Sequence, residues 1–272
     1  MPRFATANCR KKLVKARLRD CIFAFAALVG ISSGSTQAAE RVFVAGGSGR
    51  SGIEIVRVLA KSGYIVMAST RDAKRARERF GSDITWVEVA LLDPLAAREA
   101  VRGADSVASA LGHGDMVGVD SPQIVHDLAI RSLIDAAKTA GVKHMVLMSS
   151  STAGHALDHR LEPRFGFVLH WMTKSEDYLI SSGLPYTIIG PGGLVEGESE
   201  KIGARMIPRS EYKRALVSRA SVAYAVALAI SDPLARGKAI ALVADSTAKP
   251  GKIMGRYADI PMEVAPRGPA TR

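Results

Sequence analysis

The chain has 272 residues, enough for one large or two small domains, and its 47% hydrophobic and 23% charged residues are typical of a folded globular protein. Its formal net charge of +11 is uneven, because residues 1–39 hold seven basic residues and one acidic residue, which places +6 there and +5 in the remainder. No basic run with interleaved aromatic residues follows, so the composition argues against nucleic-acid binding.

Residues 1–39 have the pattern of a targeting segment: a basic stretch, an apolar run over Cys21–Ile31 and small residues up to Ala38. The apolar run of about eleven residues is too short for a helix that crosses a bilayer, so we expect no stable membrane span after processing. We predict export to the periplasm, with an organelle transit peptide or an uncleaved membrane tether as the alternatives. The stretch Cys9–Lys15 resembles a degenerate twin-arginine signal with Lys11 at the second arginine, which suggests the hypothesis of export in the folded state.

The first strand, loop and helix predict a dinucleotide site. Residues 41–45 form an apolar run typical of a buried parallel strand, and the apolar residues that follow Gly52 recur at helical spacing until Gly63. Between them, Gly46–Gly52 places glycines three residues apart, where backbone amides and a helix N-terminus can approach a pyrophosphate. A tight structural turn is the alternative for this loop.

Strands and helices alternate along the rest of the chain. Strands are expected at 64–68, 84–89, 106–111, 144–148 and 186–189, and helices at 73–80, 94–102, within 121–141 and at 167–182. Six parallel strands joined by helices predict a Rossmann-type doubly wound α/β fold over residues 40–262.

The C-terminal region is expected to form a small appended lobe over about residues 192–245. Residues 192–213 show no regular pattern, whereas 215–217 and 239–243 are predicted strands and 221–230 a predicted helix. Residues 263–272 contain prolines and a glycine and are predicted to form a disordered tail.

Arg71 bears on the choice of cofactor. It stands 19 residues after Gly52, at the end of the second predicted strand. An acidic residue there would bind the ribose hydroxyls of NAD(H), whereas a basic residue attracts the 2′-phosphate of NADP(H). Arg71 therefore favours NADP(H) over NAD(H), with a surface arginine paired with Asp72 as the alternative.

These segments together resemble the atypical short-chain dehydrogenase/reductase group that includes NAD(P)H-binding and NmrA-like proteins. The matching motifs lie within residues 41–245 and are Val44–Gly52, Ser69–Asp72, Leu92–Pro94, Ala104–Val107, Leu147–Ser150 and Tyr178–Leu194. The resemblance implies that the glycine loop binds the pyrophosphate, that the basic residue binds the 2′-phosphate, and that strands four to six end near the nicotinamide. It assigns the cofactor to Gly46, Ser48, Gly49, Arg50, Ser51, Gly52, Arg71, Leu111, Gly112, Ser149, Ser150, Pro191 and Gly192.

The chain departs from this group at two positions near the cofactor. Ala90 stands where related sequences often have an acid near the adenine. Gly190 stands where an arginine commonly precedes the proline that is Pro191 here. Any adenine contact at Ala90 would therefore fall to the backbone.

The chain differs most from this group in the residues that would transfer a proton. Classical members use a Tyr-x-x-x-Lys pair, whereas this chain has histidine at 170 and lysine at 174. His170, Lys174 and Tyr178 recur every four residues and so share a helical face. The family register places its lysine at Met172, so a solvated helical lysine is the alternative to a catalytic Lys174.

Ser149 and Ser150 are further catalytic candidates, because they follow strand five where an acceptor carbonyl would lie. A hydrogen bond that ends the strand is the alternative role for Ser149. His113, His155 and His159 also lie beyond strand ends, but without cysteine or an evident third ligand they predict no metal site. The absence of a glycine-flanked nucleophile elbow argues against a hydrolase.

The predicted function is an NADP(H)-binding oxidoreductase that reduces a small carbonyl, quinone or flavin-type acceptor, with the cofactor performing the hydride chemistry. A non-catalytic NAD(P)H-binding sensor or assembly protein is the alternative, since the Tyr-x-x-x-Lys pair is altered. The sequence identifies neither the small-molecule substrate nor the oligomeric state.

Overall fold

The computed structural model describes residues 39–154, 166–196 and 201–262. Its strands are β1 Arg41–Ala45, β2 Ile65–Thr70, β3 Thr85–Glu88, β4 Ser106–Ser109, β5 His144–Met148, β6 Tyr186–Pro191, β7 Gly193–Val195, β8 Gly203–Pro208, β9 Leu216–Ser218, β10 Lys238–Asp245 and β11 Ile253–Met254. Its α-helices are α1 Arg50–Lys61, α2 Ala73–Phe80, α3 Pro94–Ala100, α4 Ala129–Thr139, α5 Gly166–Ser181 and α6 Arg219–Ser231. Short 3-10 or π turns are η1 Gly118–Asp120, η2 Ile124–Leu128, η6 Arg209–Glu211, η7 Pro233–Ala235 and η8 Tyr257–Asp259.

The main sheet has the strand order β11-β8-β10-β6-β5-β4-β1-β2-β3. From β10 to β3 every neighbouring pair is parallel, whereas β8 runs antiparallel to β10. The strand order reverses between β1 and β4, which is the switch point where such sheets bind ligands. This arrangement confirms the predicted Rossmann-type doubly wound fold.

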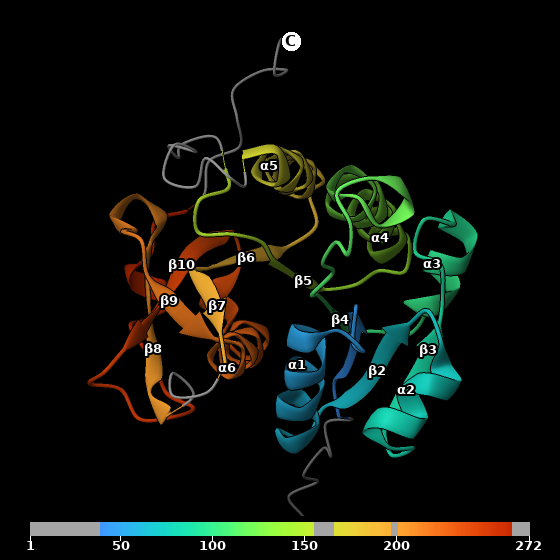
Figure 1. Ribbon diagram of the computed structural model, residues 1–272, viewed down its shortest axis with the longest axis horizontal. Helices are drawn as coiled ribbons and strands as arrows, with labels where there is room; N and C mark the ends of the chain where they lie inside the picture. Colours follow the sequence, from blue (N-terminus) through green and yellow to red (C-terminus); the bar gives the residue numbers. More distant parts are fainter. Residues whose placement is uncertain (1–38, 155–165, 197–200, 263–272) are drawn as a thin grey trace, which may run out of the picture. The chain divides into compact units, whose positions relative to one another are not determined.

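Helices cover both faces of the sheet because its central strands are buried on both sides. In β1, Val42 and Val44 belong to the core cluster that includes buried residues of α1, α2 and α6, whereas Phe43 and Ala45 belong to the cluster that includes buried residues of α3, α4 and α5. Successive side chains of a strand point to opposite faces, so an uninterrupted apolar run is what two covered faces require. The two groups of helices lie on opposite sides of the sheet in Figure 1.

Residues 192–213, where the sequence shows no regular pattern, contain two strands. This stretch contains β7, which pairs with β9 in a separate two-stranded sheet, and β8, which pairs with β10 in the main sheet. β8 is only six residues long and carries Arg205 in its middle, so it lacks the apolar run of the parallel strands. The expected appended lobe, about residues 192–245, thus contributes β8 and β10 to the main sheet.

Several sequence predictions lie outside the described residues: the targeting segment up to residue 38, the histidines at 155 and 159, and the tail at 263–272. Over the three described ranges, no helix combines the length and the apolarity needed to cross a membrane.

Candidate functional site: a dinucleotide cradle at the switch point

The loop between β1 and α1 is built around close backbone contacts. Gly46 has a φ of +74° and its amide donates to Ser69 Oγ at 2.8 Å, while the amide of Gly49 donates to the carbonyl of Gly46 at 3.0 Å. A Cβ added to Gly52 would lie 2.0 Å from the Gly46 carbonyl oxygen, and one added to Gly47 would lie 2.7 Å from Ala68 Cβ. The glycines therefore let α1 begin directly against the end of β1.

The N-terminus of α1 fits an anion. Gly49 is the N-cap residue, and no described side chain caps the first turn, which also contains no acidic residue. The first backbone N–H groups of a helix lack partners within the helix and carry its positive dipole end. Among the predicted cofactor residues here, Ser51 and Gly52 are buried and Arg50 is exposed. The amides of this turn are placed to receive a pyrophosphate.

A cavity of about 660 Å³ opens beside this loop, at the switch point between β1 and β4. Six of the predicted cofactor residues line it: Gly46, Ser48, Gly49, Arg71, Leu111 and Gly112. The chain after β3 supplies another wall, which includes Ala90 and Leu91, and the chain before α4 supplies Val119 and Asp120. This is a volume in the range of small-molecule and cofactor sites.

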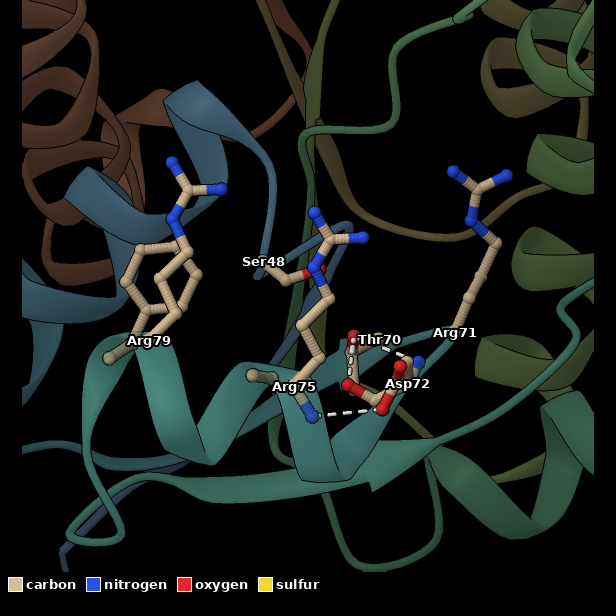
Figure 2. Close-up of a pocket in the computed structure, with 8 residues that line it drawn as sticks. Ser48, Thr70, Arg71, Asp72, Arg75 and Arg79 are labelled. Atoms are coloured by element: carbon tan, nitrogen blue, oxygen red, sulfur yellow. Dashed lines mark hydrogen bonds between the residues drawn. The ribbon is translucent and has the colours of Figure 1, made fainter.

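A second, smaller pocket of about 270 Å³ lies at the start of α2. Ser48 and Thr70 line it together with three arginines at four-residue spacing, Arg71, Arg75 and Arg79. Figure 2 shows the three side chains extending from the β2–α2 segment toward the side where Ser48 lies. Such a cluster of guanidinium groups suits a phosphate.

Sequence reasoning named Arg71 but missed Arg75 and Arg79. The signal was present, because residues four apart on a helix share one face and both arginines belong to the predicted helix 73–80.

Arg71 pairs with a carboxylate, but the partner is not Asp72. Its Nη1 lies 2.5 Å from Oδ1 and 2.7 Å from Oδ2 of Asp120, the last residue of η1. Asp72 instead caps α2, accepting a hydrogen bond from the amide of Arg75 at 2.9 Å. The predicted alternative of an Arg71–Asp72 pair is therefore wrong, because the N-cap role occupies that carboxylate.

At the end of β5, Ser149 belongs to a buried polar cluster. Its hydroxyl donates to Oε1 of Glu176, and Arg209 donates to both carboxylate oxygens of Glu176, at 2.7 and 2.9 Å. Arg209 also donates to the carbonyl of Ala153 at 3.1 Å. The cluster joins β5, α5 and η6. Ser149 thus makes the kind of hydrogen bond expected of a residue that ends a strand.

The other residues predicted near the nicotinamide also lie at the carboxyl edge of the sheet. Ser150 Oγ lies 3.1 Å from Oγ1 of Thr152, and Gly192 donates its amide to the carbonyl of Leu242 at 3.0 Å. Pro191 is buried at the end of β6. A Cβ on Gly190 would lie 2.6 Å from the carbonyl oxygen of Ser150, so no side chain fits there.

The helix α5 carries His170, Lys174 and Tyr178, whose side chains contact different partners. Tyr178 donates its hydroxyl to Asp135, and this hydrogen bond is the main cause that raises the tyrosine pKa. The ammonium of Lys174 lies 6.0 Å from the ring centroid of Trp171, and His170 packs edge-on against the same ring. The structure does not bring these three groups together as a proton-transfer unit.

His113, just beyond β4, is paired with a buried histidine. Its Nδ1 lies 2.9 Å from Nε2 of His126, and burial followed by the charge of His113 lowers the pKa of His126 to about 4. Among the described residues, no group of three or more histidine, cysteine, aspartate or glutamate side chains is arranged to hold a metal ion.

Comparison with known proteins places this geometry in context. A family model described as NAD(P)H-binding matches residues 46–233. Protein TIC 62, chloroplastic, from Oryza sativa subsp. japonica is 30% identical over 271 residues, covering 89% of this chain and 54% of that protein. NAD(P)H azoreductase from Xenophilus azovorans is 32% identical over 152 residues, covering 56% of this chain and 47% of the azoreductase. The chain thus spans about half the length of the curated relatives it matches.

A solved structure has the same fold. The short-chain dehydrogenase/reductase from Veillonella parvula in complex with NADP superimposes with a TM-score of 0.59 at 18% sequence identity, covering 78% of this chain and 98% of that one.

Proposed function

Because the chain belongs to the NAD(P)H-binding family, within the atypical short-chain dehydrogenase/reductase group, we propose that it is an NADPH-dependent reductase of a small carbonyl, quinone or flavin-type acceptor. One observation carries the proposal: Ser48, next to the uncapped N-terminus of α1, also lines the pocket that contains the three arginines. A bound nicotinamide dinucleotide would supply the hydride.

Each part of the dinucleotide has residues suited to it. The amides of Arg50, Ser51 and Gly52 would hold the pyrophosphate, since they open the first turn of α1 and no described side chain caps it. The wall formed by Ala90 and Leu91 offers an apolar surface to the adenine. Arg71 and Arg75 would hold the 2′-phosphate. The Veillonella structure shows that the same fold can hold NADP.

The relatives support a reductase activity. NAD(P)H azoreductase is by its name a reductase that uses this type of cofactor. In this chain, the acceptor would approach the carboxyl ends of β4, β5 and β6, and a Cβ at Gly112, beyond β4, would meet nothing within 4 Å. The residues would orient the acceptor and exclude water, while the choice of proton donor stays a prediction among Ser150, His170 and Lys174.

A non-catalytic sensor or assembly role is the second candidate, and one observation favours it. The hydroxyl of Ser149 is engaged by the buried pair of Glu176 and Arg209, and Lys174 contacts Trp171. The groups that would replace a Tyr-x-x-x-Lys pair are therefore not assembled in one place.

Thermal unfolding with added nucleotide tests the cofactor. A ligand present at about 100 times its Kd stabilises the folded state by about 2.7 kcal/mol, which is a Tm rise of about 5 to 10 °C for a domain of this size. We expect this rise with NADPH and a smaller one with NADH. In the variant that combines Arg71→Gln with Arg75→Gln, the NADPH rise should shrink to the NADH value; equal shifts in both proteins would contradict the 2′-phosphate assignment.

Turnover separates the two functions. NADPH oxidation followed at saturating cofactor with aldehyde, quinone, flavin and azo acceptors should show one class reduced by the enzyme. Binding of NADPH with no turnover across the panel would support the sensor or assembly role instead.

Residues 1–39 are proposed to direct the chain to its compartment. The chloroplastic relative supports organelle targeting, whereas the twin-arginine resemblance supports periplasmic export. Fractionation of cells that express the tagged chain distinguishes them, and Arg10→Gln combined with Lys11→Gln should abolish export if the twin-arginine hypothesis holds.

A further inference from the structure

Arg71 stands between the two pockets of the site. It lines both the cavity of about 660 Å³ and the arginine pocket of about 270 Å³. Its guanidinium is held by Asp120, at 2.5 and 2.7 Å from the two carboxylate oxygens. The side chain of Arg71 is 78% exposed and that of Asp120 is 27% exposed, so the pair is accessible from solvent.

Asp120 is positioned by its own segment of the chain. Its backbone carbonyl accepts the amides of Gly114 and Asp115, at 3.2 and 3.4 Å, which ties together the segment between β4 and α4. Asp120 and its neighbour Val119 line the larger cavity. The backbone of Asp120 is therefore held at the cavity wall, and its carboxylate pairs with the guanidinium that the proposed cofactor would need.

We propose that Asp120 is a specificity-determining residue, whose carboxylate competes with the 2′-phosphate of NADP(H) for Arg71. This inference rests on the proposed NADP(H) binding. A phosphate carries about −1.5 to −2 charge and accepts two parallel hydrogen bonds from a guanidinium, so it and a carboxylate repel each other when they share one arginine. NAD(H) has no 2′-phosphate and leaves the Arg71–Asp120 pair intact. Asp120 thus weakens NADP(H) binding and leaves NAD(H) binding unchanged.

Among the charged residues around Arg71, Asp120 is the carboxylate that pairs with its guanidinium. Asp72 also lies in the arginine pocket, but its carboxylate accepts the amide of Arg75 at the start of α2. Arg75 and Arg79 line only the smaller pocket, Asp120 lines only the larger one, and Arg71 lines both. Because exposed ion pairs contribute little to stability, we expect a change in affinity of about three- to tenfold.

The test is Asp120→Asn in the full chain, with dissociation constants measured for NADPH, NADH, 2′,5′-ADP and 5′-AMP. We expect NADPH and 2′,5′-ADP to bind about three- to tenfold more tightly, with NADH and 5′-AMP changed by less than about twofold. Asp115→Asn is the matched control, because it removes the same charge from an exposed residue of the same segment that lines neither pocket. It should leave all four constants unchanged.

A second variant tests whether Asp120 acts on NADP(H) binding through Arg71. Adding Arg71→Gln to Asp120→Asn should abolish the gain for NADPH, and Asp120→Ser should reproduce the gain if the asparagine variant folds poorly. Weaker NADPH binding, or an equal change for NADPH and NADH, would overturn the role of Asp120 while leaving NADP(H) binding intact. If the unaltered protein binds neither NADPH nor 2′,5′-ADP, the proposed cofactor falls, and this inference with it.

Discussion

His144, the first residue of β5, is a buried histidine whose hydrogen bonds define its protonation. Thr187 donates its hydroxyl to the carbonyl of Ala235 at 2.7 Å, so the same oxygen accepts from His144 Nε2 at 2.9 Å. The hydrogen-bond network therefore assigns the Nε2–H tautomer. The other ring nitrogen, Nδ1, is buried with no hydrogen-bond partner among the described residues. Burial, and then the charge of Arg236, lowers the pKa of His144 to about 4.

Because the pKa of His144 is lowered in the folded protein, we expect the protein to lose stability in mild acid. Because the pKa of an unfolded histidine is near 6.5, the unfolded chain binds a proton between pH 6.5 and 4 that the folded chain does not. The free energy of unfolding should therefore fall as the pH drops through this window, by about 2 kcal/mol for His144 at pH 5. His144→Gln keeps an N–H donor for Thr187 and cannot titrate. Urea unfolding at pH 7 and pH 5 should show a smaller loss in this variant; equal losses would exclude His144 as the cause.

Gly52 is the residue at which a single methyl group should do most damage. Alanine normally stabilises a helix over glycine by about 1 kcal/mol, but here the new Cβ would lie 2.0 Å from the carbonyl oxygen of Gly46. We expect Gly52→Ala to lower the free energy of unfolding by about 3 kcal/mol, because backbone must move to admit it. Gly112→Ala is the control, since a Cβ there meets nothing within 4 Å. If both variants melt like the unaltered chain in urea, the close contact at Gly52 is not as described.

Among the elements, α5 and η6 are joined by an ion pair that water does not reach. The side chains of Glu176 and Arg209 are 1% and 6% exposed. They hydrogen-bond to each other, while Glu176 also accepts from Ser149 and Arg209 also donates to the carbonyl of Ala153. Removing one partner of such a pair leaves a buried charge, whereas replacing both with apolar groups does not. The pair should therefore matter more for joining these elements than for net stability.

A double-mutant cycle tests this reading of the pair. Glu176→Leu and Arg209→Met should each lower the free energy of unfolding by about 3 to 5 kcal/mol, and the double variant should lose much less than the two together. The exposed pair of Glu99 on α3 and Arg102 just after it is the matched control, where Glu99→Leu should cost less than about 1 kcal/mol. Additive losses at Glu176 and Arg209 would show that the two side chains act independently.

The elements that sequence analysis predicted well are those with a local signal. β1 and α2 have the predicted bounds. The signal for β1 is an apolar run, and the signal for α2 is a charged helix with a capping residue, so each is contained in the residues of the element itself. β8 could not be recognised, since a strand of six residues without an apolar run depends on pairing with β10 and β11. The Arg71–Asp120 pair lay beyond sequence reasoning for the same reason, as it joins residues 49 positions apart. Local sequence patterns therefore predicted the strand, glycine loop and helix at the start of the fold, whereas contacts between distant residues could not be predicted from them.

At the scale of the whole molecule, the main sheet depends on β10, a strand that lies outside the residues matched by the NAD(P)H-binding family model. The NAD(P)H-binding match ends at residue 233, and β10 begins at Lys238 between β6 and β8. Ile240, Leu242 and Tyr257 are fully buried in the core that contains α1 and α6, and Ile260 is 3% exposed. Lys238 donates through Nζ to the carbonyl of Ile260 at 2.5 Å, which ties the end of the described chain back to β10.

A chain that ends at Pro233 should therefore fail to fold, although it contains the whole glycine loop and both pockets. Burial of each large apolar side chain contributes about 1.5 to 3 kcal/mol, so losing the four just named removes an amount comparable to the net stability of about 5 to 15 kcal/mol of an ordinary domain. It would also expose β6 as an unpaired edge. Circular dichroism during heating should show no cooperative transition in this chain, whereas a chain ending at Met262 should melt like the full protein. A cooperative transition at the same Tm in both would mean that the strands up to β6 form a core that is stable without β10.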